Sequence, residues 1–458
     1  MSNYKEKFKR TRIGVLFVSP RARDETNVLK MWYTKSVQDI ETSLSESFPF
    51  IEFVCREGGT RSDILKILRD INDVAGYIVF NFQSIAGAVR PVLWSGKPTI
   101  FVAETYLGSG EFLMEYSRAI KAGMPVVGIV DRNVHDVQKL ARYIKLLDVI
   151  NKLRASRMLI IADPVVRDYI QLQYPLSIDI YSAVSQLQTL TGIDLQLVSV
   201  RDFVEKYYGN TTDEEARPIA KKWWNESDKV VDHLEDELVK PARLYLAMKK
   251  AIEDYNADAL GVDCITLYYS GLLDTWPCLG FMELAKEGVV PLCEADVYAG
   301  VAMLAMKYFA NVPGYINDPA LDMEKDEIVY YHCQAPINPH GFDSGEECSY
   351  VITPAHWGAK KLSVHTKLPT DESATLVGFN PADKIVTIHT AHIERNEYND
   401  RECATKVVGK AETRAIAENW NWRAGWHRVL FYGDWREDWK ALAKLLGLGV
   451  MEEDKTSD

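Results

Sequence analysis

Two acidic residues directly follow a short apolar run near the middle of the chain. Residues 289–293 are apolar in the manner of a buried parallel strand, and Glu294 and Asp296 come next. Charged groups at the end of a buried strand are costly unless something binds them. Open α/β sheets bind their ligands at this end of their strands. A third acid, Glu283, lies on the preceding helical segment, which Gly288 ends. These acids are the first candidates for a reactive site.

Histidines could complete such a site. Eight of the nine lie at or after residue 233, and seven lie in the last third of the chain. Carboxylates and imidazoles together form a mixed oxygen and nitrogen ligand set, which suits Mn²⁺, Mg²⁺ or another octahedral ion better than a thiolate-bound zinc. Spacing alone leaves the ligands open, because an acidic chain offers many such combinations.

The totals limit the classes of function. A chain of 458 residues is expected to form two or three domains. Its net charge of −12 argues against nucleic acid or an anionic membrane as a partner. We expect no membrane span, because no apolar run reaches 18 residues, and no signal peptide, because the basic start lacks an apolar region. Seven cysteines without a C-x-x-C pair predict reduced thiols and a cytoplasmic location.

The first two thirds of the chain alternate strand and helix patterns. This rhythm predicts two doubly wound parallel α/β domains, at 1–155 and 156–320. No G-x-G-x-x-G follows the first strand, so we expect no dinucleotide cofactor. The expected strands are 12–19, 51–55, 75–80, 98–103, 125–130, 157–163, 193–200, 259–266 and 289–293, with helices at 25–47, 61–71, 110–122, 134–153, 213–227 and 239–256.

The last third has a different texture. Short strands alternate with Gly, Pro, Asn and Asp, which predicts an antiparallel β-rich domain, a barrel or a sandwich, at 321–458. A closing helix is expected at 438–446. The predicted fold class is therefore α/β, with two parallel domains followed by a β-rich, barrel-like domain. The expected strands of this domain are 329–333, 348–353, 362–366, 374–379, 384–390, 403–408 and 429–434.

Three segments resemble one enzyme family. The segment from Phe281 to Asp296 looks like the metal-site segment of L-fucose isomerase. The His332-Cys333 pair is similar to an element of fucose-isomerase-like proteins. The tail 418–434, with its Asn-Trp and Trp-His pairs, resembles a segment near the carboxyl end of those enzymes. The order of these motifs and the three-part architecture also agree. The chain thus resembles the L-fucose/L-arabinose isomerase superfamily.

The resemblance implies an aldose–ketose isomerase that acts through an enediol. The family's metal ligands fall on Glu283, Asp296 and His427, and the metal implied is Mn²⁺, with Mg²⁺ or Co²⁺ as alternatives. Glu283 and Asp296 would also serve the proton transfers. Arg428 and Gln334 stand where the family has glycines, and the two acids are closer together than expected. These departures leave the sugar open.

The same resemblance implies a monosaccharide substrate and a homo-oligomer, a trimer or hexamer, in which a neighbouring subunit closes the pocket. Trp94, Arg21 or Arg23 would reach the substrate across that interface. An additional cation, Arg428 or Lys360, would suit an anionic sugar such as a phosphate or sulfonate. The candidate substrate residues are Arg21, Arg23, His332, Trp420, Trp426 and Arg428.

Structural explanations stand beside these roles. Glu283 could face solvent on its helix, Asp296 could cap the following helix, and His427 could be a hydrogen-bonded core residue. Glu294 is expected to orient a neighbour or to pair with an arginine rather than to bind metal. Arg21 and Arg23 could belong to a solvated loop. The alternative functions are a non-catalytic sugar-binding protein, and a lyase or epimerase that uses the same metal-bound enediolate.

Overall fold

The computed structural model describes residues 10–19, 28–83, 87–163, 180–269, 271–273, 275–356, 359–399 and 401–455. The chain forms two compact units, one of 1–155 with 438–449 and one of 156–437 with 450–458. Within the described ranges, no helix is both long and apolar enough to cross a bilayer. The boundaries at 155 and 320 stay predictions, and the second unit contains both an α/β sheet and the β-rich region.

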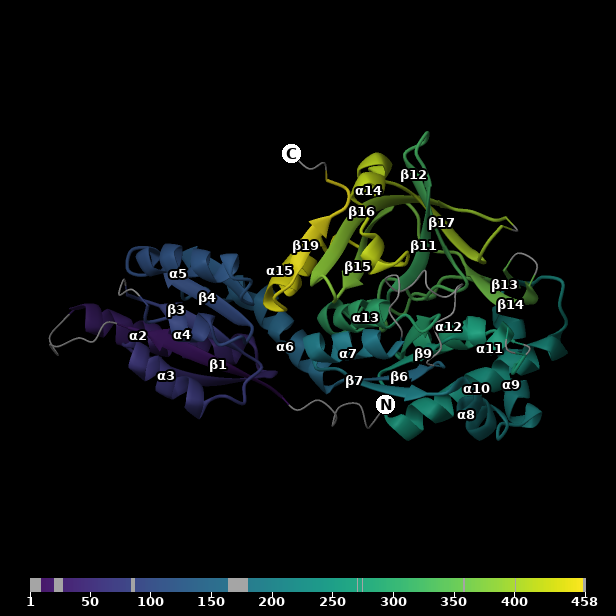
Figure 1. Cartoon of the computed structure of the whole chain (residues 1–458), viewed down its shortest axis with the longest axis horizontal. Helices are drawn as coiled ribbons and strands as arrows, with labels where there is room; N and C mark the ends of the chain where they lie inside the picture. Colours follow the sequence, from purple (N-terminus) through teal and green to yellow (C-terminus); the bar gives the residue numbers. More distant parts are fainter. Residues whose placement is uncertain are drawn as a thin grey trace. The chain divides into compact units, whose positions relative to one another are not determined.

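The first unit is a parallel α/β layer. Its sheet has the strand order β2-β1-β3-β4-β5, and all its pairings are parallel. Strands β3 and β4 have apolar centres and are buried along their whole length, as expected for strands covered by helices (Figure 1). Its elements are β1 Thr11–Val18, α2 Val28–Ser47, β2 Ile51–Gly58, α3 Arg61–Asp70, β3 Gly76–Asn81, α4 Arg90–Leu93, β4 Thr99–Glu104, α5 Ser109–Lys121, β5 Val126–Asp131 and α6 Ala141–Ala155.

The second unit begins with another parallel sheet, in the order β10-β9-β6-β7. Its apolar core joins these strands to helices α9, α10 and α12. The helices are α7 Ile180–Thr191, α8 Val200–Phe203, α9 Asp213–Glu226, α10 Val239–Tyr255, α11 Cys264–Tyr269, α12 Cys278–Lys286 and α13 Val297–Ala310. The strands are β6 Arg157–Ile161, β7 Asp194–Val198, β9 Ala259–Val262 and β10 Val290–Cys293.

The remainder of the second unit is a closed antiparallel barrel of six strands, in the order β15-β18-β11-β12-β17-β16, with β16 paired back to β15 (Figure 1). Closure leaves no strand edge unpaired. The fold class predicted from the sequence is confirmed. The barrel strands are β11 Tyr315–Asp322, β12 Glu327–His332, β15 Glu372–Asn380, β16 Ile385–Asn396, β17 Thr405–Lys410 and β18 Arg428–Tyr432.

Smaller elements complete the chain. A three-stranded sheet consists of β8 Lys229–Val230, β13 Tyr350–His356 and β14 Ala359–Thr366. Helix α14 Thr413–Asn419 precedes β18, and α15 Arg436–Leu445 follows it. Strand β19 Gly449–Glu452 joins the barrel sheet at β16. The sequence patterns predicted most of the longer elements. They missed β11, the barrel strand that pairs with β18 and β12.

Candidate metal centre

The first part of the candidate centre is the tight turn between β10 and α13. Glu294 and Ala295 both have a φ of 56°, a left-handed conformation that side chains other than glycine seldom adopt. Strain of this kind is typical of functional sites. Asp296 then begins α13, and its Oδ1 accepts hydrogen bonds from the backbone N–H groups of Tyr298 (2.9 Å) and Ala299 (3.0 Å). The expectation that Asp296 caps this helix is confirmed.

The second part is one rim of the barrel. Three neighbouring strands, β18, β11 and β12, each bring one side chain to this rim. His427 stands directly before β18, Asp318 lies on β11, and His332 ends β12. The register sets Asn317 opposite Arg428 and Asp318 opposite Tyr331, so the three side chains come from adjacent positions. Antiparallel pairing thus assembles residues that are far apart in the sequence.

Glu294, His332 and His427 form a group that can hold a metal ion, because their ligand atoms all lie within 4.8 Å of one another. Nε2 of His332 lies 3.7 Å from Oε1 of Glu294, and Nε2 of His427 lies 3.8 Å from Oε2 of the same carboxylate. Both histidines are buried, and the Glu294 side chain is 11% exposed. Two imidazoles and a carboxylate suit a divalent transition metal.

Asp318 adds a second carboxylate to this group. Its Oδ1 lies 3.3 Å from Nε2 of His427. The residue is buried, yet this oxygen accepts no hydrogen bond within the described part of the chain. A buried carboxylate oxygen without a donor is costly unless a cation faces it. Asp318 therefore fits a metal ligand together with Glu294 and His427.

The orientation of His427 is fixed from behind. Its Nδ1 donates a hydrogen bond of 2.9 Å to Oδ2 of Asp296. A proton on Nδ1 leaves the lone pair on Nε2, the nitrogen that faces Glu294 and Asp318. Carboxylates that hold metal-binding histidines in this way are a regular feature of metal sites. Both oxygens of Asp296 are engaged, one by the helix and one by His427, which favours an orienting role.

The charges of the group are strongly coupled. Burial raises the pKa of Asp318 to about 7, with Glu294 adding repulsion and His427 opposing the shift. Burial alone would lower the pKa of His427, but the carboxylates of Asp318, Asp296 and Glu294 raise it to about 9. In the absence of a cation, the three carboxylates thus stabilise the protonated, positively charged form of His427.

Glu283 lies outside this group. It is buried on α12, where its Oε1 pairs with Nζ of Lys222 and its Oε2 accepts a hydrogen bond of 3.0 Å from Nε1 of Trp223. These contacts join α12 to α9. Its roles as a ligand and a catalytic acid stay predictions, and the contacts favour a structural role.

The substrate residues named from the sequence are spread over several places. Trp426 adjoins the centre, where its ring packs edge-on against Tyr331 and its Nε1 donates to the carbonyl of Pro319. Trp420 and the fully buried Arg428 contact each other inside the barrel instead. His332 belongs to the metal-binding group. Arg21 and Arg23 lie outside the described residues.

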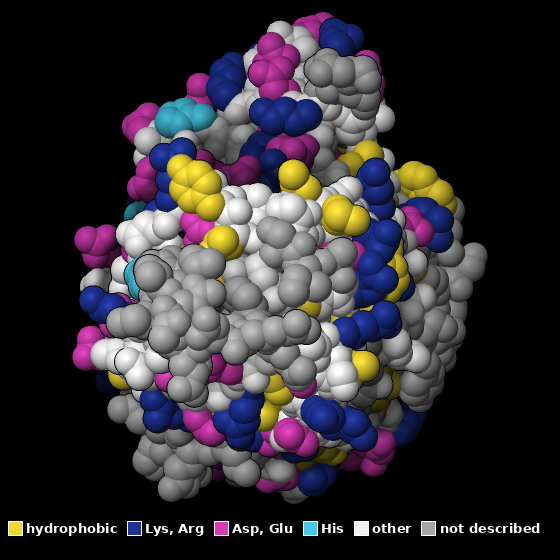
Figure 2. Space-filling model, turned by 90° about the vertical axis from the view of Figure 1, so that its left-hand side faces the viewer, with side chains coloured by type: hydrophobic (Ala, Val, Ile, Leu, Met, Phe, Trp, Pro, Cys, Tyr) yellow, Lys and Arg dark blue, Asp and Glu magenta, His cyan; other side chains and the backbone are white. Residues whose placement is uncertain are grey.

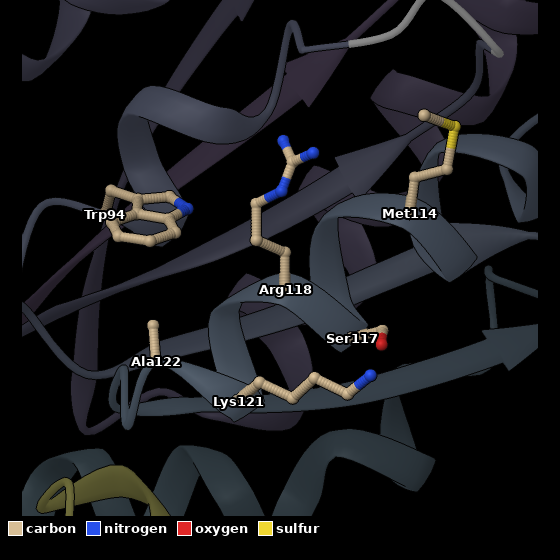
Figure 3. Close-up of a pocket in the computed structure, with 6 residues that line it drawn as sticks. All are labelled: Trp94, Met114, Ser117, Arg118, Lys121 and Ala122. Atoms are coloured by element: carbon tan, nitrogen blue, oxygen red, sulfur yellow. The ribbon is translucent and has the colours of Figure 1, made fainter.

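Trp94 belongs to the first unit. It is 42% exposed and borders a hollow of about 410 Å³ that is also lined by Met114, Arg118 and Lys121 (Figure 3). One face of the molecule shows hydrophobic side chains among lysines and arginines (Figure 2). The role of Trp94 across an interface stays a prediction.

Three of the residues that the geometry brings forward, Glu294, His332 and Asp318, are not among the ligands predicted from the sequence. The sequence predicts an orienting role for Glu294 and a substrate role for His332, and it gives no prediction for Asp318. The available signal for Asp318 was the sequence Tyr315-Ile-Asn-Asp-Pro-Ala, which sets polar side chains among buried positions after Gly314. Such an interruption of a buried strand is costly without a partner, and it indicates a site.

Comparisons with known proteins give a partial similarity to two sugar isomerases. No protein-family model matches the chain. The sulfoquinovose isomerases of Priestia aryabhattai and Priestia megaterium are each 29% identical to it over 104 residues, which is 22% of this chain and 23% of the relative. The match thus spans under a quarter of these relatives. Over this segment the chain is similar to these sugar isomerases.

A solved glucose-galactose binding protein from Geobacillus stearothermophilus is a further match, at 11% identity, over 66% of this chain and 92% of that chain. Its TM-score of 0.18 is too low to support a conclusion about fold or function.

Proposed function

We propose that this protein is a divalent-metal-dependent sugar isomerase that interconverts an aldose and a ketose through an enediol. The observation that carries the proposal is the convergence of Glu294, Asp318 and the Nε2 face of His427, with Asp296 fixing the imidazole from behind. His332 is a fourth possible ligand. The similarity to sulfoquinovose isomerases supports the reaction class.

The roles follow from the donor set. Glu294, Asp318 and His427 would hold the cation, Mn²⁺ in our proposal and Mg²⁺ or Co²⁺ as alternatives. A divalent cation in such a site polarises the sugar carbonyl and stabilises negative charge on the neighbouring oxygens. In the aldose-to-ketose direction, one of the two carboxylates would remove the proton from C2, and the other, as its acid, would give a proton to C1. The first carboxyl would then protonate O1, and the hydroxyl proton of O2 would restore the second acid. Unequal environments can divide these roles, since Glu294 lies in the turn after β10 and Asp318 lies on β11 in the barrel.

The substrate in this proposal is a monosaccharide with an anionic group. Sulfoquinovose is the first sugar to test, because the relatives carry its name. Trp426 beside His427 offers an aromatic face for the C–H surface of a sugar ring. We further propose a cytoplasmic homo-oligomer, a trimer or hexamer, in which Trp94 of one copy contributes to the pocket of another.

The test is a proton-exchange experiment in D₂O. The protein would be incubated with Mn²⁺ and a panel of neutral and anionic aldoses and ketoses, and the sugars followed by NMR. We expect deuterium at C1 or C2 together with aldose–ketose interconversion. Exchange without interconversion would indicate an epimerase, and cleavage products would indicate a lyase.

Matched variants locate the reaction. Glu294→Gln, Asp318→Asn and His427→Ala should each abolish exchange and Mn²⁺ binding. Glu327→Gln is the control, because Glu327 forms a barrel ion pair with Arg395 and Lys410 instead. Full exchange by all three site variants would contradict the proposal. If the wild-type protein binds a sugar, but binds no metal and incorporates no deuterium into the sugar, it is a sugar-binding protein.

A further inference from the structure

A buried ion pair lies inside the barrel, one residue from the candidate metal ligand. Arg428 and Glu453 are both fully buried. Nε of Arg428 donates to Oε2 of Glu453 at 3.1 Å, and Nη2 donates to Oε1 at 2.6 Å. Such a pair gains little net stability over apolar residues of similar size, because both charges lose their hydration. Its presence therefore calls for an explanation other than stability.

The arginine makes two more contacts that bear on the metal centre. Its Nη1 donates to the backbone carbonyl of His427 at 2.8 Å and to that of Gly425 at 3.2 Å. Trp420 stacks on the guanidinium, with 3.6 Å between Cζ and the ring centre. The planar fork is thus held on one side by Glu453 and on a face by Trp420. The guanidinium thereby fixes the backbone of residues 425–427, which places His427 at the barrel rim.

The carboxyl-terminal segment brings Glu453 into the barrel. The backbone N–H of Glu453 donates to the carbonyl of Ile388 on β16 at 2.8 Å. Its Oε2 also accepts a hydrogen bond of 3.0 Å from Nδ1 of His389. Asn419 donates to the carbonyls of Glu453 and Lys455, at 3.3 and 2.7 Å. These bonds fix the Glu453 carboxylate in the barrel interior.

We propose that Glu453 and Arg428 are positioning residues for the metal ligand His427. The carboxylate holds the guanidinium, and the guanidinium holds the carbonyl of His427. Asp296 holds the imidazole of the same residue from the α/β side. The backbone and the ring of His427 are thus anchored from two different layers of the second unit, which sets the direction of Nε2. This inference rests on the proposed metal centre.

The arrangement assigns Arg428 a different role from sugar binding. Three of its nitrogens donate to Glu453, Gly425 and His427, and none of its surface is exposed. A substrate would have to displace Glu453 to reach it.

The test compares metal affinity with stability. The double variant Arg428→Met/Glu453→Gln removes both charges, which avoids leaving an unpaired buried ion. Arg428→Lys keeps a charge beside Glu453 but loses the planar fork. Mn²⁺ affinity would be measured on folded, full-length protein by electron paramagnetic resonance titration. We expect both variants to bind Mn²⁺ 10- to 100-fold more weakly, as is typical when the support of a ligand is lost.

The control is Glu327→Gln, which breaks another barrel ion pair and makes no contact with the 425–428 turn in the described structure. It should lower stability and leave Mn²⁺ affinity within twofold. If the wild-type protein binds Mn²⁺ and Arg428→Lys binds it with the same affinity, the positioning role is overturned and the proposed function stays intact. Should the double variant not fold, Arg428→Lys still decides. A wild-type protein without Mn²⁺ binding would overturn both proposals.

Discussion

The hydrogen bond of 2.9 Å from Nδ1 of His427 to Oδ2 of Asp296 joins two parts of the second unit. Asp296 starts α13 at the end of the parallel sheet, whereas His427 precedes a barrel strand, 131 residues later in the chain. The same aspartate caps α13 through its other oxygen. One carboxylate therefore fixes the start of a helix and the orientation of a candidate metal ligand.

Replacing Asp296 with asparagine should weaken metal binding without unfolding the protein. The amide oxygen can still accept from the backbone of Tyr298 and Ala299. Only one oxygen then remains, so the cap and the bond to Nδ1 of His427 compete for it. We expect 10- to 100-fold weaker Mn²⁺ binding, measured by titration.

Asp296→Ser separates the two functions of this residue. Serine is a good helix cap but is too short to hold the imidazole. If the cap alone mattered, the serine variant would bind Mn²⁺ like the wild type. That result would contradict the orienting role.

Glu283 and Glu294 should respond differently to the same substitution. Glu294→Gln removes a carboxylate that lies 3.7 and 3.8 Å from the two imidazoles, so Mn²⁺ binding should be lost. Glu283→Gln breaks the contact with Lys222 and should cost about 1–3 kcal/mol of stability while Mn²⁺ affinity stays within twofold. Metal titration and urea denaturation of both variants measure the two effects. Loss of metal in Glu283→Gln would instead support the ligand role inferred from the family resemblance.

The fold was more predictable than the site. Hydrophobic periodicity and turn residues are local signals, and they gave the parallel sheets and the β-rich region. The site depends on pairing between distant strands. Asp318 reaches His427 only because β11 pairs with β18, and β11 itself was missed near the expected boundary at 320.

The turn after β10 shows a second limit. Glu294 and Asp296 are two residues apart in an acidic segment, so their spacing cannot tell a ligand from an orienting residue. The different roles of Glu294 and Asp296 depend on the left-handed backbone conformation of Glu294 and Ala295. Similarly, the sequence predicts Arg428 as a possible contact of an anionic sugar. No local pattern indicates that it pairs with Glu453, 25 residues later in the chain.

Metal affinity should rise with pH between about 6 and 9. In the metal-free protein the pKa of Asp318 is raised to about 7 and that of His427 to about 9. A cation needs the carboxylate and an imidazole lone pair, so bound protons must leave. Each proton released makes apparent affinity rise by up to about tenfold per pH unit below the relevant pKa. Mn²⁺ titrations across this range measure the slope, and a flat profile would contradict a site that includes these two residues.

Acid should remove the contribution of Glu453 to stability. Burial alone would raise the pKa of this carboxyl, but Arg428 and His389 lower it from 4.5 to about 2. A carboxyl with a lower pKa in the folded state stabilises the fold above its unfolded pKa, and this contribution falls as pH drops from about 4.5 towards 2. The full contribution is of the order of 3 kcal/mol, and roughly a third to a half of it is lost by pH 3.5. The double variant Arg428→Met/Glu453→Gln lacks this titrating group. Urea denaturation at pH 6 and pH 3.5 should therefore show the wild type losing on the order of 1 kcal/mol more than the variant. Equal losses would show that the ion pair does not hold the carboxylate ionised.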